Sequence, residues 1–466
     1  MLHDRAENSV RFAQTQGASY CDLRSEVIEG QHLIVEKGHL EHMTTRRIQG
    51  VGVRVLCDGA WGFFSATDLT KLEQGITDAI KAARHNASKK KIKVKLADVL
   101  TVQKKISYPV KKEPTLDEMG KIAFECDKRI RNNRKISRDT VSISSISGTK
   151  YFVNSDGTKI EQTTSDVTID LTATAHEAGM TQSISTTEGG RGGLEKITDD
   201  VNAYSVSEEI AYKVSTLLDA KAPKEEKATL VMNPDFVALL THEILGHPSE
   251  ADRVLGKEMA WAGGAWWTGM LGQKIGSENL SVIDDPTIHG SLGWYEYDDE
   301  GVKSQRKELV KEGILANHMH SRETASIFGV EPNASMRATS YSFMPLIRMA
   351  CTCIEKGDWD PQEMIKDVRH GYLVSNMKVP SIDMKRHNWS ISCQYANRIE
   401  NGEIKEMLRD VIVVGVAPEF FRSIDACGKD FTVRPITNCG KGDPMQQMRM
   451  GNGGPSIRGI ATIRST

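Results

Sequence analysis

The segment VMNPDFVALLTHEILGH, residues 231–247, has the features of a buried helix in an otherwise strand-rich second half of the chain. Asn233 or Asp235 can cap its N-terminus, and Pro234 falls in the first turn, where its missing N–H costs nothing. Apolar side chains recur at helical spacing and give the helix one buried face: Phe236, Val237, Leu239, Leu240 and Ile244. The segment therefore predicts a core helix with a polar cluster at its C-terminal end.

That polar cluster is His242, Glu243 and His247. Imidazoles are directional nitrogen ligands for zinc and similar ions, and an adjacent glutamate can act as general base on metal-activated water. The histidines are five positions apart, so a regular helix would separate them by roughly 140° around its axis. They can share one ion only if the helix ends, loosens or forms a π-type bulge between them. Because Gly246 and Pro248 both disfavour a continuing helix, we expect it to end at Gly246.

A tetrahedral catalytic site takes three protein ligands and leaves one position open. Composition and spacing do not choose the third ligand among the downstream acids, the later histidines and a late cysteine: Glu250, Asp252, Glu258, His289, His318, His320 and Cys439. Glu250 and Asp252 can instead orient a ligand histidine through its second nitrogen, or be ordinary surface charges. His176–Glu177 begins like the motif but has no second histidine nearby, so we expect a surface pair.

Three tryptophans follow the histidine motif in WAGGAWWTG, residues 261–269. The glycines between them would allow a mobile flap over a cleft. Large aromatic side chains more often pack in a core, so core packing is the favoured interpretation of Trp261, Trp266 and Trp267.

The composition is that of an ordinary globular protein with two or three domains: 466 residues, 39% apolar and 26% charged. A net charge of -2 gives no reason to expect a nucleic-acid or membrane partner. The N-terminus lacks a signal-peptide pattern, and no apolar run is long enough to span a bilayer, so we expect a cytoplasmic protein. The eight cysteines form no CxxC pair, which favours reduced, buried thiols.

Alternating apolar and polar residues with glycine punctuation predict antiparallel strands at 21–30, 31–37, 48–59, 60–66, 141–157 and 166–179. Helical spacing predicts helices at 8–15, 69–85, 116–132 and 205–218. The polar linker APKEEK, residues 222–227, marks a boundary. We expect an α+β region at 1–222 (subunits about 1–95 and 96–222) and a β-rich domain at 223–466. The expected fold class is α+β: N-terminal antiparallel sheets flanked by helices, then a flattened, barrel-like C-terminal domain.

Four segments of the second half resemble, in this order, the TldD branch of the TldD/PmbA family, once called modulators of DNA gyrase. They are HEILGHPSEAD (242–252), GQKIGSENLSVIDD (272–285), YDDEGVKSQRKELVKEGIL (297–315) and NCGKGDPMQQMRMGNGGPSIRG (438–459). The first 220 residues resemble the family more loosely. The last segment is richer in Met and Gln than is usual in the family, which leaves the substrate preference open.

The resemblance implies a metallopeptidase in which His242, His247 and Cys439 hold the metal ion and Glu243 is catalytic. A thiolate ligand is chemically reasonable, because metal binding itself drives deprotonation. The alternative for Cys439 is a buried free thiol, and Cys427 in a second CGK, residues 427–429, is a competing candidate.

The implied function is metal-dependent hydrolysis of short or unfolded polypeptides, with one divalent ion, zinc being the expected metal. Glu243 is the expected general base on metal-activated water. The family also implies a homodimer or a heterodimer with a PmbA/TldE-like subunit. Two alternatives stay open: a non-catalytic regulator of gyrase or of a toxin–antitoxin system, and a metal-dependent hydrolase of a non-peptide amide.

Overall fold

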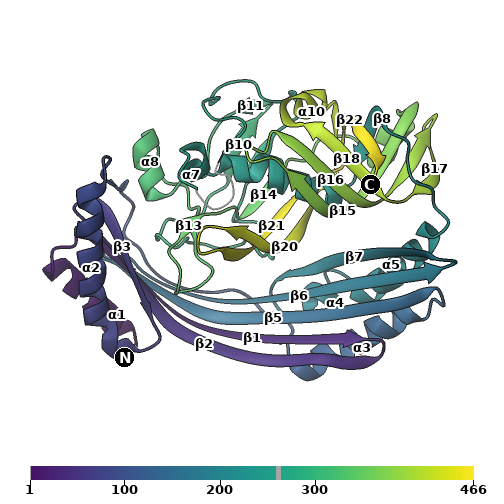
Figure 1. Ribbon diagram of the computed structural model, residues 1–466. Coiled ribbons are helices and arrows are strands. Elements are labelled where there is room, and N and C mark those ends of the chain that lie inside the picture. Colours follow the sequence, from purple (N-terminus) through teal and green to yellow (C-terminus); the bar gives the residue numbers. More distant parts are fainter. Residues whose placement is uncertain (1, 259–263) are drawn as a thin grey trace.

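The structure is a computed structural model that describes residues 2–258 and 264–466, so the expectation for Trp261 lies outside the described residues. It has two parts (Figure 1): a long, curved N-terminal sheet with helices, and a β-rich C-terminal part that lies on the concave side of that sheet. None of the described helices is both long enough and apolar enough to cross a membrane.

The N-terminal sheet has the strand order β3-β2-β1-β5-β6-β4, with β7 also paired to β6. The two expected strands at 21–30 and 31–37 are one continuous strand, since Gly30 does not interrupt the pairing of β1 with β2. Strands from both expected subunits, about 1–95 and 96–222, belong to this one sheet. Its strands are β1 (Tyr20–Glu36), β2 (His39–Cys57), β3 (Ala60–Ala66), β4 (Gln103–Ser107), β5 (Ile136–Asn154), β6 (Lys159–Glu177) and β7 (Met180–Arg191).

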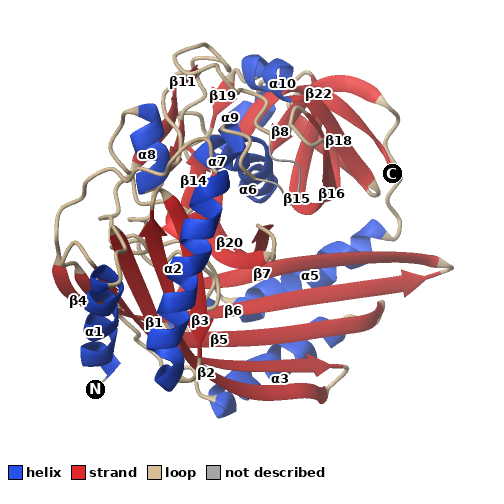
Figure 2. Cartoon of the chain, turned by 60° about the vertical axis from the view of Figure 1, so that its left-hand side comes forward, coloured by secondary structure: helices blue, strands red, loops and turns tan. Residues whose placement is uncertain are grey.

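The two faces of this sheet have different roles. In β1, Leu23 and Leu33 belong to apolar clusters shared with helices, whereas Arg24 and Glu26 hydrogen-bond to the C-terminal part. Successive side chains of a strand point to opposite faces, so the helices cover one face and the C-terminal part covers the other. The helices are α1 (Leu2–Thr15), α2 (Leu72–Lys89), α3 (Leu116–Arg131) and α5 (Ala203–Leu217) (Figure 2). The last three lie close to the expected ranges, whereas α1 begins six residues before the expected start at residue 8.

The C-terminal part contains a closed barrel, which confirms the expected fold class. Its ring is β15-β8-β22-β18-β16, and β16 pairs back to β15. β8 begins within the polar linker at 222–227. The barrel strands are β8 (Glu226–Met232), β15 (His370–Ile382), β16 (Asn388–Glu400), β18 (Val411–Val416) and β22 (Ile457–Ser465).

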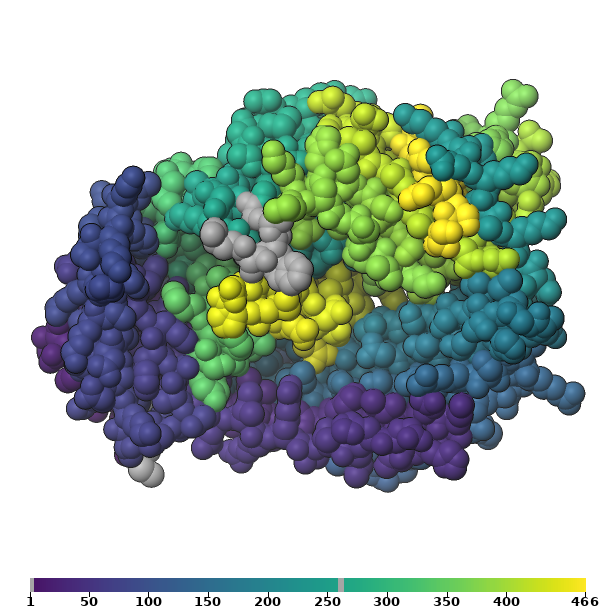
Figure 3. Space-filling model, in the orientation of Figure 1, coloured from purple at the N-terminus to yellow at the C-terminus, as the bar shows by residue number. Residues whose placement is uncertain are grey.

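A second, smaller sheet lies beside the barrel, in the order β11-β10-β9-β14-β21-β20. Its last strand, β20, lies over the N-terminal sheet, and in Figure 3 the yellow segment that contains β20 and β21 sits between the barrel and that sheet. The strands are β9 (Val282–Asp284), β10 (Lys307–Lys311), β11 (Ile314–Leu315), β14 (Cys351–Ile354), β20 (Thr432–Lys441) and β21 (Gln446–Gly454). Helix α6 (Pro234–Thr241) packs against β15 on one side and β21 on the other, which brings its C-terminal end to β20.

Candidate metal centre

The helix that begins the site is α6, and its N-terminus follows the sequence prediction. The Phe236 N–H donates to Asn233 Oδ1 over 3.0 Å, and Pro234 occupies the first turn. Asn233 is therefore the cap. Asp235, the other candidate cap, instead pairs with Arg434 on β20 at 2.7 Å, so it ties the helix to the strand that carries Cys439.

A π turn, His242–Gly246, continues α6, which confirms the π-type alternative among the three that the histidine spacing allows. The expectation that the helix ends at Gly246 is wrong, because a further helical turn follows. The N–H of His247 donates to the carbonyl of His242, five residues earlier, and this places the two histidines one turn apart. A 3-10 turn, His247–Ser249, follows. Gly246 allows Met349 to pack closely against the turn and does not end the helix, because a Cβ at this position would lie 2.1 Å from Met349 Sδ.

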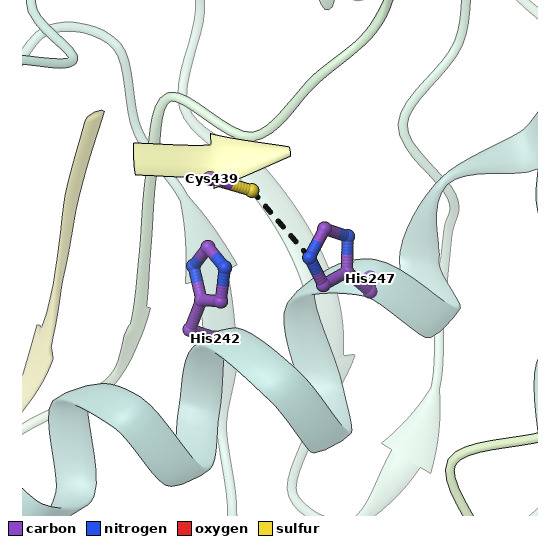
Figure 4. Close-up of side chains that lie close together, drawn as sticks. All are labelled: His242, His247 and Cys439. Carbon is purple, nitrogen blue, oxygen red and sulfur yellow. Dashed lines mark hydrogen bonds between the residues drawn. The ribbon is translucent and has the colours of Figure 1, made fainter. Parts of the chain in front are cut away.

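The structure brings His242, His247 and Cys439 together, each of them buried (Figure 4). One ligand atom from each residue lies within 4.8 Å of the other two. Cys439 Sγ and His247 Nε2 are 3.5 Å apart, and a tetrahedral zinc ion with ordinary Zn–S and Zn–N bonds separates such atoms by about 3.5 Å. The residues present therefore fit a divalent metal ion.

Each histidine of this group is oriented through its other ring nitrogen. His242 Nδ1 and Asn452 Oδ1 are 3.0 Å apart, and His247 Nδ1 and Glu250 Oε2 are 3.1 Å apart. Both imidazoles thus keep Nε2 for an ion, a common arrangement at metal sites. Of the two roles considered for Glu250, orientation of a histidine is the one observed. Asn452 was not anticipated, because it stands 210 residues from its partner.

A buried group of charges surrounds Glu250. Arg253 Nε donates to Glu250 Oε2 over 2.7 Å, and Lys441 Nζ lies 3.2 Å from the same oxygen. Lys441 also pairs with Asp252 at 2.8 Å. Burial alone would raise the pKa of Glu250, but the charges of Lys441 and His247 hold it well below its ordinary value. The lysine of the NCGK segment therefore keeps Glu250 ionised as an acceptor for His247.

The group has the electrostatics of a cation site. Burial raises the pKa of the Cys439 thiol, but the charges of His242 and His247 outweigh burial and hold this pKa well below its ordinary value. Burial lowers the pKa of His242, but the Cys439 thiolate outweighs it and raises the pKa to about 9. The thiolate thus needs positive charge beside it, which protons or a divalent ion can supply.

Glu243 lies beside this group and faces a cleft of about 670 Å³. Burial raises its pKa, but the charges of His242 and Arg386 outweigh burial and lower the pKa to about 2, so Glu243 is a carboxylate at neutral pH. Arg386 hydrogen-bonds to Glu243 Oε2 and to its carbonyl oxygen. The cleft is walled by β15, β20 and the N-terminal sheet, through residues that include Lys378, Pro380, Asp170, Thr186, Thr437 and Asn438.

The other ligand candidates lie in different surroundings. Cys427 is buried, and its thiol contacts the carbonyl of Asn279. His289 stacks on Trp294, while His318 and His320 pack against Phe328. Glu258 is buried and is not part of the metal group. His176–Glu177 is exposed at the end of β6, as predicted for a surface pair.

Trp266 and Trp267 are packed against the histidine motif. Trp266 Nε1 donates to the carbonyl of Ile244 over 2.9 Å, and Trp267 Nε1 donates to that of Pro248 over 2.7 Å. Trp267 is fully buried. Trp267 is a core residue, and Trp266 is partly buried and packs against the same core, as favoured. Both also supply donors to backbone carbonyls of the motif.

Comparison with known proteins agrees with this geometry. Residues 225–460 match the PmbA/TldA metallopeptidase C-terminal domain, residues 97–218 its central domain and residues 21–87 its domain 1. A metalloprotease of Methanocaldococcus jannaschii is 31% identical over 95% of this chain and 96% of its own length. A zinc metalloprotease TldD homolog of Saccharolobus solfataricus is 26% identical over 96% of this chain and 97% of its own.

Solved structures share the fold. A Thermotoga maritima protein described as a modulator of a DNA gyrase superposes with a TM-score of 0.81 at 19% identity, over 99% of this chain and 100% of its own. TldE from Thermococcus kodakarensis gives a TM-score of 0.77 at 18% identity, over 99% of this chain and 100% of its own. The sequence matches extend through the histidine motif and Cys439. This chain therefore belongs to the PmbA/TldD family of metallopeptidases.

Proposed function

We propose that this metalloprotease hydrolyses short or unfolded polypeptides, and that His242, His247 and Cys439 hold a zinc ion. The observation that carries the proposal is the buried His-His-Cys group, whose ligand atoms lie within 4.8 Å of one another beside a glutamate. Two imidazoles and one thiolate are a donor set that suits zinc, and three protein ligands leave a position open, as catalytic sites require. The zinc metalloprotease of Saccharolobus solfataricus supports the choice of metal.

When bound, the ion would supply Lewis-acid polarisation of the scissile carbonyl and activation of water. Glu243 is the base of this mechanism: its carboxylate takes a proton from the attacking water and passes it to the departing amine. Asn452 and Glu250 hold the two imidazoles in one orientation, with Nε2 facing the thiolate. Burial of the group excludes bulk water and strengthens these interactions.

The cleft supports an extended peptide as substrate. β20 is the outermost strand of its sheet, and its pairing with β21 is irregular between Ile436 and Cys439. A peptide laid along this free edge would receive backbone hydrogen bonds beside the metal group, as in other strand-addition complexes. His242 and His247 are each only 3% exposed, so a folded protein cannot reach them. Short and unfolded chains are therefore the expected substrates.

The assembly and the compartment are part of the same proposal. The fold is shared with TldE, so we expect a homodimer or a heterodimer with a PmbA/TldE-like subunit, and no nucleic-acid or membrane partner. All eight cysteines of the chain are free and buried, and all lie in the described residues. Reduced thiols suit the cytoplasm, where we place the protein.

Replacement of Glu243 by alanine tests the catalytic role. We expect cleavage of an unfolded polypeptide to fall by at least about 100-fold, the usual contribution of a general base, while metal content and thermal midpoint stay unchanged. Glu278→Ala, at an exposed position, is the control and should cleave like the parent. A Glu243→Ala protein that cleaves at the parent rate contradicts the mechanism, and a parent that cleaves no peptide with its metal in place favours a regulatory role.

A matched pair of cysteine replacements tests the third ligand. Cys439→Ala should lose most of its bound metal, because two imidazoles alone bind zinc weakly. Cys427→Ala should keep it, since this thiol lies elsewhere in the core. Elemental analysis of freshly purified protein measures the metal and identifies it in the parent. Equal metal content in the two variants would show that Cys439 is not a metal ligand.

A further inference from the structure

The π turn at the metal group leaves backbone carbonyls to be satisfied by side chains. In a π turn the carbonyl of Glu243 would accept from residue 248, but that residue is Pro248 and has no N–H. The N–H of His247 is already donated to His242. Arg386 Nη1 donates to the Glu243 carbonyl over 3.2 Å instead. Buried carbonyls require such a partner, so the guanidinium has a fixed place at this turn.

The same Arg386 nitrogen also hydrogen-bonds to Oε2 of the Glu243 side chain. One guanidinium therefore bridges the backbone and the carboxylate of a single residue, which restricts the side-chain rotamers of Glu243. Both side chains are largely enclosed, at 14% exposure for Arg386 and 16% for Glu243. Among the residues that the structure describes, none hydrogen-bonds to Oε1, which leaves this oxygen to accept a proton.

The loop that carries Arg386 is built to present it. Residues 383–387 connect β15 to β16, and the Asp383 carboxylate accepts the backbone N–H groups of Lys385, His387 and Asn388 over 2.9 to 3.1 Å. Arg386 itself has a φ of 60°, in the left-handed region that costs a non-glycine residue free energy. Such strain persists only where the surroundings determine it, and it is common at functional sites.

We propose that Arg386 is the positioning residue of the reaction: it holds the Glu243 carboxylate in one orientation beside the metal group. This inference rests on the proposed function, in which Glu243 is the base. Arg386 acts through Glu243 and lies on a different element, 143 residues further along the chain. The orientation of the base, and not the binding of substrate, is what its guanidinium supplies.

Arg386→Met removes the bridge and keeps much of the side-chain volume. We expect kcat on an unfolded peptide to fall by about 10- to 100-fold, because a misplaced catalytic group costs rates of this order. KM should stay within about twofold, as for an interaction that acts on the chemical step. Arg386→Lys keeps the positive charge but not the planar guanidinium, and its kcat should lie between those of the parent and Arg386→Met. Lys385→Met, in the same loop, is the control and should match the parent.

Chemical rescue separates positioning from a merely structural role. Guanidinium ion at millimolar concentration should restore part of the kcat of Arg386→Ala, and should not raise that of the parent or of Glu243→Ala. Metal content by elemental analysis and the thermal midpoint are measured on every variant. Metal content should stay at the parent value, whereas the thermal midpoint of the Arg386 variants should fall, because the Glu243 carbonyl and carboxylate lose their donor. In a Glu243→Ala background, Arg386→Met should have no further effect on kcat, since the group it positions is gone.

The inference is overturned if Arg386→Met keeps the parent kcat, or if its KM rises while kcat is unchanged, which would mark a substrate-binding residue. It is also overturned if metal content and kcat fall together and neither lysine nor guanidinium restores them. These failures differ from that of the proposed function, which is a Glu243→Ala protein that remains fully active.

Discussion

The two histidines of the metal group each have a hydrogen-bond partner, and these partners show how the group is oriented. His242 is oriented by Asn452 and His247 by Glu250. Glu250 is in turn held by Lys441, which is fully buried. A buried lysine beside two carboxylates is stable only because the charges are paired. The orientation of the two imidazoles is therefore set by residues outside the His-His-Cys group.

A second buried acidic pair lies far from the metal group, at Asp127 on α3 and Asp139 on β5, and both are fully buried. The N–H of Gly38 and Arg131 Nε donate to Asp127. Burial and the hydrogen bond to Asp127 raise the pKa of Asp139 to about 7. Because this value lies above that of an unfolded chain, protonated Asp139 favours the folded state, and its stabilising effect is lost as pH rises from about 4 to about 7.

Asp139→Asn should remove this pH dependence. Below about pH 4, where Asp139 is protonated in both the folded and the unfolded state, the variant should unfold at the same denaturant concentration as the parent, because the amide can donate to Asp127 as the protonated carboxyl does. At pH 8 it should be more stable than the parent, which buries a charge there. Asp117→Asn, at an exposed position of α3, is the control. If the stability of the parent and of Asp139→Asn changed with pH in the same way, Asp127 and Asp139 would not share a proton.

At the scale of elements, the irregular end of α6 sets the spacing of the two histidines. The π turn brings residues five apart onto one face, and side chains from other segments satisfy its free carbonyls. Ser249 Oγ donates to the carbonyl of Leu245 over 2.8 Å in the same way. A short irregular element of this kind persists only because its surroundings supply donors.

Gly246→Ala tests the packing of this turn. The new Cβ would lie 2.1 Å from Met349 Sδ, and Met349 also contacts Asn452, the partner of His242. We expect a loss of about 1–3 kcal/mol in unfolding free energy, typical of overpacking a core, together with reduced metal content. Gly120→Ala, in α3 where the added methyl meets nothing within 4 Å, should instead stabilise the protein by up to about 1 kcal/mol. Chemical denaturation measures the unfolding free energy of both variants. An unchanged value for Gly246→Ala would show that the Met349 side chain can move to make room for the added methyl group.

At the scale of the whole molecule, buried ion pairs join the N-terminal sheet to the C-terminal part, and both parts line the cleft. Arg54 on β2 pairs with Asp22 on β1 at 2.5 Å and with Glu300 of the C-terminal part at 3.3 Å. Arg434 on β20 pairs with Glu188 on β7. The sheet is thus held to the β-rich part by two separate groups of charges, and residues of both parts line the cleft.

Arg54→Met should weaken this junction strongly. It would leave Asp22 and Glu300 buried without their cation, and removal of one partner of a buried ion pair usually costs about 3–5 kcal/mol. The midpoint of denaturation should fall accordingly. Arg47→Met, on the same strand, breaks an exposed pair with Glu29 and should change stability by less than about 1 kcal/mol. Equal effects of the two substitutions would show that the buried group does not hold the parts together.

The local pattern of apolar and polar residues was enough to predict many of the N-terminal helices and strands. Period-two alternation located β1, β2, β3, β5 and β6, and helical spacing located α2, α3 and α5 within a few residues. β7 was missed, because its segment MTQSISTTEGGR has few apolar residues to alternate. The continuity of the N-terminal sheet was also missed, since strand order depends on contacts between distant segments. The division of the chain at about 95 and 222 stays a prediction.

The sequence by itself determined the helix that carries His242 and His247, its cap at Asn233 or Asp235 and the need for the helix to end, loosen or form a π turn between the histidines. These follow from spacing, which is a property of neighbouring residues. Only the tertiary structure decided which residues complete the centre, because Cys439 stands 192 residues from His247, and Arg386 stands 143 from Glu243. Resemblance to a family pointed to Cys439, whereas no pattern pointed to Arg386. Such pairs meet only when β20 and the β15–β16 loop pack against the end of α6, and packing at long range leaves no periodic trace in the chain.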